Sequence, residues 1–180
     1  KFLGAMAEAG RTTKQHTVRI EDVRASGLLK EQIILGHTQG VDAAESALVR
    51  FAVDRVRLYE RKWAAYTAAT GEPAVHPALV IQVADKPSES ELATLVATTL
   101  EEWPGIDASA VVHTFADHAD LVVGGYRIPW CPPEDIQDRP EIRIVLCKTA
   151  ITTGWDCPRA EVLLSFRVAK DLDLITQIMG

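Results

Sequence analysis

The stretch EIRIVLCKTAITTGWDCPRAEVLLSF, residues 141–166, decides the fold of this chain. Two apolar runs, residues 142–147 and 161–166, flank a polar turn that contains a glycine and a carboxylate, Gly154 and Asp156. Glycine permits positive φ and lets a backbone approach a ligand closely, and Asp oxygens accept hydrogen bonds. Because open α/β sheets bind ligands beyond the carboxyl ends of their strands, the stretch predicts a ligand-binding turn between two strands.

Residues 150–167 read AITTGWDCPRAEVLLSFR, and residues 175–180 read ITQIMG. Together these segments resemble motif V and the start of motif VI of superfamily 2 helicases, and more narrowly the DEAD/DEAH-type ATPase core of type III restriction enzyme Res subunits. The two motifs occur in the family's order, with a predicted strand between them. The close resemblance covers residues 142–180, about a fifth of the chain. It implies the second RecA-like lobe of such an enzyme, an α/β domain in which helices flank a parallel sheet.

Two positions depart from the family pattern. Motif V more often has Thr at the place of Lys148, and motif VI usually reads Gln-Arg, whereas Gln177 precedes Ile178. The arginines of motif VI would follow Gly180, the last residue of the sequence. The sequence also has neither a phosphate-binding GxxxxGKS or GxxxxGKT loop nor an acidic run of the DEAD or DEAH type. We therefore expect the chain to be a piece of a longer protein and to be inactive as an ATPase by itself.

The resemblance implies an ATP-dependent DNA helicase or translocase, a hydrolase that acts in restriction-modification. ATP and Mg²⁺ would be bound by the full-length protein, with neither held tightly by this chain alone and no metal ligand among its residues. The implied partners are DNA, the N-terminal RecA-like lobe of the same protein and a methyltransferase subunit. The implied site residues are Gln177 for catalysis, Gly154, Asp156 and Gly180 for the nucleotide, and Thr152, Thr153 and Lys148 for nucleic acid.

The chemistry of these side chains matches the implied roles. The Asp156 carboxylate would accept hydrogen bonds from ribose hydroxyls, and Gly154 would allow close backbone approach. Thr152 and Thr153 would contact DNA phosphate or relay closure of the cleft. Gln177 would lie near the γ-phosphate of ATP.

Composition limits the alternatives. At 180 residues, of which 47% are hydrophobic, the chain can bury one substantial core but is too short for two RecA-like lobes. No run approaches the roughly 20 apolar residues of a membrane span, and the first residues lack the apolar core of a signal peptide. The three cysteines lack CxxC spacing, which favours reduced thiols and a cytoplasmic location.

The charge balance bears on the DNA interaction. A net charge of −6 argues against a dedicated nucleic-acid-binding module, whose binding surface is normally basic. The cations near the predicted turn are few: Lys148, Arg159 and Arg167. The chain alone is therefore predicted to bind DNA weakly.

The remaining sequence predicts a helical segment over residues 1–72 and the truncated lobe over residues 73–180. A short helix is predicted over residues 20–29, with a turn at Gly27, and a short strand covers residues 32–35. A long helix runs from Asp42 to Thr70 and stops at a glycine. Its apolar side chains form a stripe with helical spacing: Ala44, Leu48, Ala52, Val56, Tyr59, Trp63 and Tyr66.

Within the predicted lobe, the apolar run at 78–84 indicates a buried parallel strand. Ser88 and Glu91 form a capping box for a helix that ends at Pro104-Gly105, and residues 110–114 form the next strand. The strand-helix-strand order predicts a parallel crossover. The prolines within 124–140 predict an irregular loop inserted on the surface.

Other interpretations stay open. The turn at Gly154 also fits an ordinary tight turn with Trp155 packed on the core. The competing functional class is a non-catalytic RecA-like or Rossmann-like interaction domain that docks through the long helix.

Two site types have weaker support. The cysteines with His113 or His118 have irregular spacing for zinc. Asp135 or Asp138 followed by Glu141 and Arg143 is similar to a restriction-type nuclease site, but Arg replaces the usual Lys.

Overall fold

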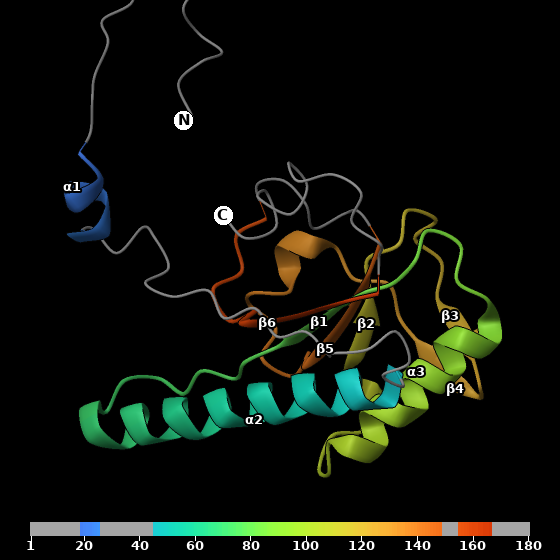
Figure 1. Ribbon diagram of the computed structural model, residues 1–180, viewed down its shortest axis with the longest axis horizontal. Helices are drawn as coiled ribbons and strands as arrows, with labels where there is room; N and C mark the ends of the chain where they lie inside the picture. The colour runs from blue at the N-terminus through green and yellow to red at the C-terminus, as the bar shows by residue number, and fades with distance from the viewer. Residues whose placement is uncertain (1–18, 26–44, 149–154, 167–180) are drawn as a thin grey trace, which may run out of the picture. The chain divides into compact units, whose positions relative to one another are not determined.

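The computed structural model describes residues 19–25, 45–148 and 155–166 (Figure 1). The chain divides into two compact units, residues 1–36 with residue 180, and residues 37–179. Of the first unit, the described part is the short helix α1 (Ile20–Ala25), next to which Arg19 pairs with Asp22 at 2.9 Å. This helix confirms the first part of the helix predicted over residues 20–29, whereas residues 26–29 and the strand predicted at 32–35 lie outside the described residues.

Within the described residues, the second unit is built on a sheet of four parallel strands. The strands are β1 (Leu79–Gln82), β2 (Val111–His113), β5 (Ile144–Cys147) and β6 (Val162–Ser165), and their order in the sheet is β2-β5-β1-β6. Every residue of the two central strands, β1 and β5, is buried, as expected of parallel strands covered on both faces, and the residues of β2 at the edge are buried too. The strands predicted from the apolar runs at 78–84, 110–114, 142–147 and 161–166 are all present. The predicted fold class is confirmed, because a parallel sheet is flanked by helices in an arrangement consistent with a RecA-like lobe.

Helices α2 (Glu45–Thr70) and α3 (Glu89–Glu102) cover one face of the sheet (Figure 1). The predicted capping box begins α3: the Glu91 N–H donates to Ser88 Oγ at 3.2 Å, and the Ser88 N–H donates to the Glu91 carboxylate at 2.6 Å. The core between helices and sheet includes Val53, Val56, Leu92, Val96, Trp103, Ile81, Ile144 and Leu146. The helix-covered face therefore holds the larger part of the hydrophobic core.

Helix α2 ends where the sequence predicts, because Gly71 has a φ of 75° and its N–H donates to Thr67 O at 2.9 Å. The predicted apolar stripe is only partly correct. The buried side chains of α2 are Val49, Ala52, Val53 and Val56. Tyr66 is 50% exposed, because the C-terminal part of α2 extends past the sheet (Figure 1). The predicted start at Asp42 lies outside the described residues.

Side chains in the middle of α2 contact residues next to the strands. Glu60 pairs with Arg143 just before β5, and the Trp63 indole N–H donates to Glu161 just before β6. Near its start, Arg50 pairs with Glu102 of α3 at 2.7 Å. Helix α2 thus packs directly on the sheet. The predicted boundary between a helical segment at 1–72 and a lobe at 73–180 stays a prediction.

The segment at 124–140 is more ordered than predicted, because it contains short regular elements and buried side chains. Strands β3 (Leu121–Val123) and β4 (Tyr126–Ile128) pair in an antiparallel hairpin whose turn is Gly124-Gly125. Prolines exclude long elements but not a strand this short. Two short 3₁₀ helices complete the unit, η1 (Ala108–Ala110) and η2 (Pro133–Asp135).

Residues of the 124–140 segment also cover the second face of the sheet. The side chains of Cys131 and Ile136 are fully buried there. They pack with residues that point away from the helices: Val80, Val112, Ile142, Val145, Cys147 and Cys157. This segment takes the place that a helix would take in a sheet covered by helices on both faces.

Candidate functional site

The sheet has a switch point between its two central strands. From β1 the chain passes through α3 to β2, the strand at one edge of the sheet. From β5 it continues to β6, the strand at the other edge. Connections that leave neighbouring strands in opposite directions create a crevice beyond their carboxyl ends, where open α/β sheets bind ligands. The segment predicted to bind a ligand follows β5 directly in sequence, and its residues 149–154 lie outside the described residues.

The carboxyl ends of the strands are held together by the Gln82 side chain. This residue is 3% exposed, and its Nε2 donates to Lys148 O at 2.9 Å. Its Oε1 accepts from Ser165 Oγ at 2.8 Å. Backbone bonds continue the pairing just beyond the strands, from the Val83 N–H to Cys147 O and from the Phe166 N–H to Gln82 O, each at 2.9 Å. The exits from β5 and β6 therefore have defined positions relative to β1.

Lys148, predicted to contact nucleic acid, lies directly after β5 and is half-buried. Its Nζ is 4.4 Å from the centroid of the Phe115 ring, a cation–π distance. In the part of the chain that the structure describes, its ammonium is paired with no carboxylate. The Lys148 ammonium thus lies just beyond the carboxyl end of β5, over the Phe115 ring.

Asp156, predicted to bind the nucleotide, is exposed. The residue before it is anchored, because the Trp155 indole N–H donates to Pro133 O at 2.7 Å and its ring packs on the second core cluster. The alternative in which Trp155 is a packing residue is therefore correct for that side chain. The exposed carboxylate next to it remains available for a ligand.

The other predicted site residues lie outside the described residues: Thr152, Thr153, Gly154, Gln177 and Gly180. Among the residues described, no hydrogen bond or ion pair joins Lys148 to Asp156. The roles predicted for the five residues outside the described ranges rest on the sequence alone.

Arg159 is not one of the cations that can meet DNA. It is 4% exposed, and burial lowers the pKa of its guanidinium from the usual value. The guanidinium donates to backbone carbonyl oxygens of His76, Ile136, Arg139 and Ile142 at 2.6 to 3.1 Å. The sequence could not show this, because an arginine's burial depends on which carbonyl groups the fold brings around it.

The three cysteines come together on the second face of the sheet, which their irregular spacing does not indicate. Cys131, Cys147 and Cys157 are free thiols and buried in one cluster. Burial raises the pKa of Cys147 to about 12. No group of His, Cys, Asp or Glu side chains is placed to hold a metal ion within the described ranges. The cysteines therefore pack as small apolar side chains here.

The residues that are similar to a nuclease site do not converge. Glu141 is exposed and pairs with Arg139 at 2.8 Å. Arg143 contacts Glu60 on α2, donates to Pro77 O at 3.0 Å and lies over the Trp103 ring at 5.2 Å. Its charge is thus directed to the helix-covered face.

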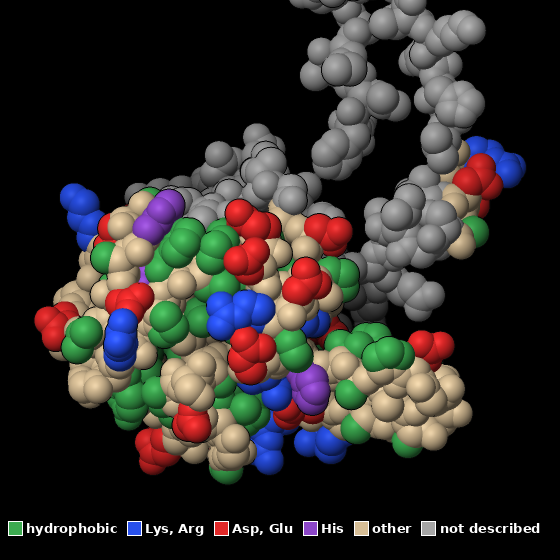
Figure 2. Space-filling view, turned by 180° about the vertical axis from the view of Figure 1, so that it is seen from behind, with side chains coloured by type: hydrophobic (Ala, Val, Ile, Leu, Met, Phe, Trp, Pro, Cys, Tyr) green, Lys and Arg blue, Asp and Glu red, His purple; other side chains and the backbone are tan. Residues whose placement is uncertain are grey.

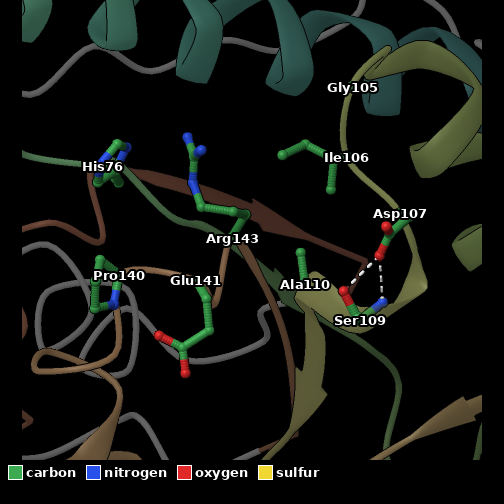
Figure 3. A pocket seen from close by; sticks show the side chains of 9 residues that line it. All are labelled: His76, Gly105, Ile106, Asp107, Ser109, Ala110, Pro140, Glu141 and Arg143. Carbon is green, nitrogen blue, oxygen red and sulfur yellow. Dashed lines mark hydrogen bonds between the residues drawn. The ribbon is translucent and has the colours of Figure 1, made fainter.

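A cavity of about 370 Å³ lies at the opposite end of the sheet (Figure 3). It is lined by residues that precede the strands, including His76 before β1, Asp107 and Ser109 before β2, and Glu141 and Arg143 before β5. Asp107 is already bonded to the Ser109 N–H at 2.8 Å. Because ligand sites of open parallel sheets lie at the carboxyl edge, this cavity is a weaker candidate than the switch point.

On the face seen in Figure 2, acidic and basic side chains are interspersed rather than sorted into a basic area. Among the helices that the structure describes, none is long and apolar enough to cross a membrane.

Comparison of the chain with family models, with curated proteins and with solved structures finds no match in any of the three.

Proposed function

We propose that this chain is the second RecA-like lobe of an ATP-dependent DNA helicase or translocase of the type III restriction enzyme Res type. The observation that carries the proposal is the position of one segment. Residues that resemble motif V directly follow β5, one of the two strands at the switch point of the sheet. A segment that meets nucleotide and DNA backbone belongs at such a crevice.

The described side chains fit this role. The exposed Asp156 carboxylate would accept hydrogen bonds from the ribose hydroxyls of ATP. The Lys148 ammonium would pair with a phosphate of DNA. By the resemblance, Gly154 allows close approach of the nucleotide, Thr152 and Thr153 contact the DNA backbone, and Gln177 and Gly180 belong to the γ-phosphate side of the cleft.

The remaining parts of the ATP site are assigned to the rest of the protein. The phosphate-binding loop belongs to the N-terminal lobe, and the arginines of motif VI would follow Gly180. Mg²⁺ is given no ligand in this chain. In related phosphoryl-transfer enzymes an arginine that stabilises the transition-state charge is worth roughly 10³ to 10⁵ in rate, which is why we expect this lobe to be inactive by itself.

The test uses the natural protein that carries this chain together with its first lobe. ATP hydrolysis is measured against ATP concentration, with and without duplex DNA, for the parent and for Asp156→Ala. Loss of a charge-assisted hydrogen bond, worth about 1.5 to 3 kcal/mol, should lower kcat/KM for ATP roughly 10- to 100-fold without changing the melting temperature.

Asp54→Ala is the control, because Asp54 is also an exposed carboxylate but lies on α2, which covers the helix-packed face of the sheet. It should behave like the parent. A parent without DNA-stimulated hydrolysis contradicts the proposal. So does an Asp156→Ala protein that hydrolyses ATP normally but melts many degrees lower, since the turn would then be structural.

A second candidate is a non-catalytic interaction domain of RecA-like or Rossmann-like type. The C-terminal part of α2, which extends past the sheet with Tyr66 half-exposed, favours it (Figure 1). Under this alternative Tyr66→Ser abolishes partner binding, whereas Asp156→Ala has no effect on any activity.

A further inference from the structure

Gln82 is the one polar side chain in the buried run 78–83. A buried carboxamide costs free energy unless both its donor and its acceptor are satisfied, and an apolar residue would suit the position better for packing alone. Here each half of the carboxamide has a partner on a different neighbouring strand, Lys148 O beyond β5 and Ser165 Oγ on β6. The side chain thus spans the switch point from one neighbour of β1 to the other.

We propose that the Gln82 carboxamide is a positioning residue that couples the chain leaving β5 to the chain leaving β6. This inference rests on the proposed function, because these exits lead to the segments that resemble motifs V and VI. The first would meet nucleotide and DNA, and the second would carry the charge that acts on the γ-phosphate. A single rigid link between the two exits transmits a shift of one to the other.

The geometry requires a carboxamide in particular. Lys148 O accepts and therefore needs an N–H, whereas the Ser165 hydroxyl donates to an oxygen. Glutamate keeps the acceptor for Ser165 but sets a carboxylate oxygen against Lys148 O. Leucine keeps the volume and removes both bonds. The two variants therefore separate loss of one link from loss of both.

Backbone pairing shows why the link acts on position rather than on strand formation. The Val83 N–H donates to Cys147 O, and the Phe166 N–H donates to Gln82 O. These bonds keep the strands paired when the carboxamide is removed. What Gln82→Leu loses is the pair of side-chain bonds, to Lys148 O one residue beyond β5 and to the Ser165 hydroxyl at the end of β6.

The experiment again uses the natural two-lobed protein, with DNA stimulation of ATP hydrolysis as the readout. Gln82→Leu should keep the KM for ATP near the parental value and lose about tenfold in stimulation by DNA, the amount expected for one to two neutral hydrogen bonds. Gln82→Glu should lose stimulation as well. Ser165→Ala removes one of the two bonds, so it should lose about threefold in stimulation by DNA, half of the Gln82→Leu effect in free energy. Ser165→Thr keeps the hydroxyl and should show the parental stimulation.

Thr99→Val is the control for stability. Thr99 is a buried polar residue of α3 whose hydroxyl donates to Leu95 O at 2.7 Å, away from the strand ends. This variant should be destabilised but keep full stimulation by DNA. If Gln82→Leu and Thr99→Val lose stimulation equally, or if Gln82→Leu loses none, the positioning role is wrong.

A second readout does not depend on ATP hydrolysis. Amide hydrogen exchange in peptides covering residues 145–157 should become about fivefold faster in Ser165→Ala and stay parental in Ser165→Thr, although residue 165 lies on another strand. Unchanged exchange overturns the coupling. A parent that lacks DNA-stimulated hydrolysis but shows this exchange pattern overturns the proposed function and leaves the link between the strand exits standing.

Discussion

Arg143 and Glu60 form an ion pair that joins the start of β5 to the middle of α2. The Arg143 side chain is 10% exposed, and its Nε also donates to Pro77 O, just before β1, at 3.0 Å. One guanidinium thus connects two strands to the helix that covers them. Because the pair is largely buried, removal of one partner leaves a charge that water cannot fully solvate.

Glu60→Ala should therefore lower the free energy of unfolding by about 2 to 4 kcal/mol. Urea denaturation followed by circular dichroism measures the change. Arg50→Ala is the comparison, since Arg50 pairs with Glu102 but is 63% exposed, and exposed pairs contribute about 0 to 1 kcal/mol. Equal losses for the two variants would show that the Glu60 pair is solvated like a surface pair.

The hairpin turn gives a second prediction. Gly124 and Gly125 both have positive φ, 57° and 82°, which costs an alanine about 1 kcal/mol. A Cβ on Gly124 would also lie 2.8 Å from the Cβ of Ala93 on α3, whereas one on Gly125 would meet nothing within 4 Å. Gly124→Ala should thus destabilise the protein by at least about 1 kcal/mol more than Gly125→Ala. Thermal melts of both variants check the order, and the reverse order would mean that the hairpin does not pack on α3.

A buried hydroxyl just after β2 gives the third prediction. Among the described residues, Thr114 Oγ1 is buried without a hydrogen-bond partner. Thr114→Val removes this unsatisfied group at nearly constant shape and should raise the free energy of unfolding by about 1 kcal/mol. Thr99→Val should lower it, because the Thr99 hydroxyl is bonded. Destabilisation by Thr114→Val would indicate that the hydroxyl has a partner in the folded protein.

The fourth prediction is a pH dependence of stability that comes from His113. Its ring is buried, Nδ1 accepts from the Phe115 N–H at 3.2 Å, and Nε2 bonds Ala119 O at 2.9 Å, so the neutral ring with its proton on Nε2 fits. Burial lowers the pKa of His113 below its usual 6.5, Lys148 adds to the effect, and the Ala119 bond with Asp117 and Asp120 opposes it.

A lowered pKa means that the unfolded chain binds the proton more readily than the folded one. The contribution of His113 to stability is therefore present above pH 6.5 and is lost as the pH falls through 6.5 toward the lower folded value. Urea denaturation between about pH 7.5 and about pH 5.5 should show this fall for the parent and for His76→Gln, an exposed control, but less for His113→Gln. An NMR titration of the parental His113 ring at or above 6.5 would refute the prediction.

How far the sequence predicts this structure depends on the range of the interactions. The capping box of Ser88 and Glu91 is local, and the pattern found it. The paired glycines of the hairpin are also local, but the prolines around them suggested a loop. The exposure of Tyr66 could not be predicted from helical spacing, because the length of the sheet under α2 is a property of the whole fold. The Gln82 bridge joins residues 66 and 83 positions apart, and no spacing rule reaches that far.

The last prediction concerns DNA binding by this chain alone. Arg159 is used inside the fold, which leaves Lys148 as the described cation next to the predicted turn. With one or two phosphate contacts, the logarithm of the binding constant should fall with the logarithm of salt concentration by a slope no steeper than about −2. Titration of labelled duplex across salt concentrations measures it. Lys148→Ala should reduce the slope by about 1, whereas Lys62→Ala, on the exposed side of α2, should not. Submicromolar affinity at physiological salt, or a slope that Lys148→Ala leaves unchanged, would place the DNA contact elsewhere on the chain.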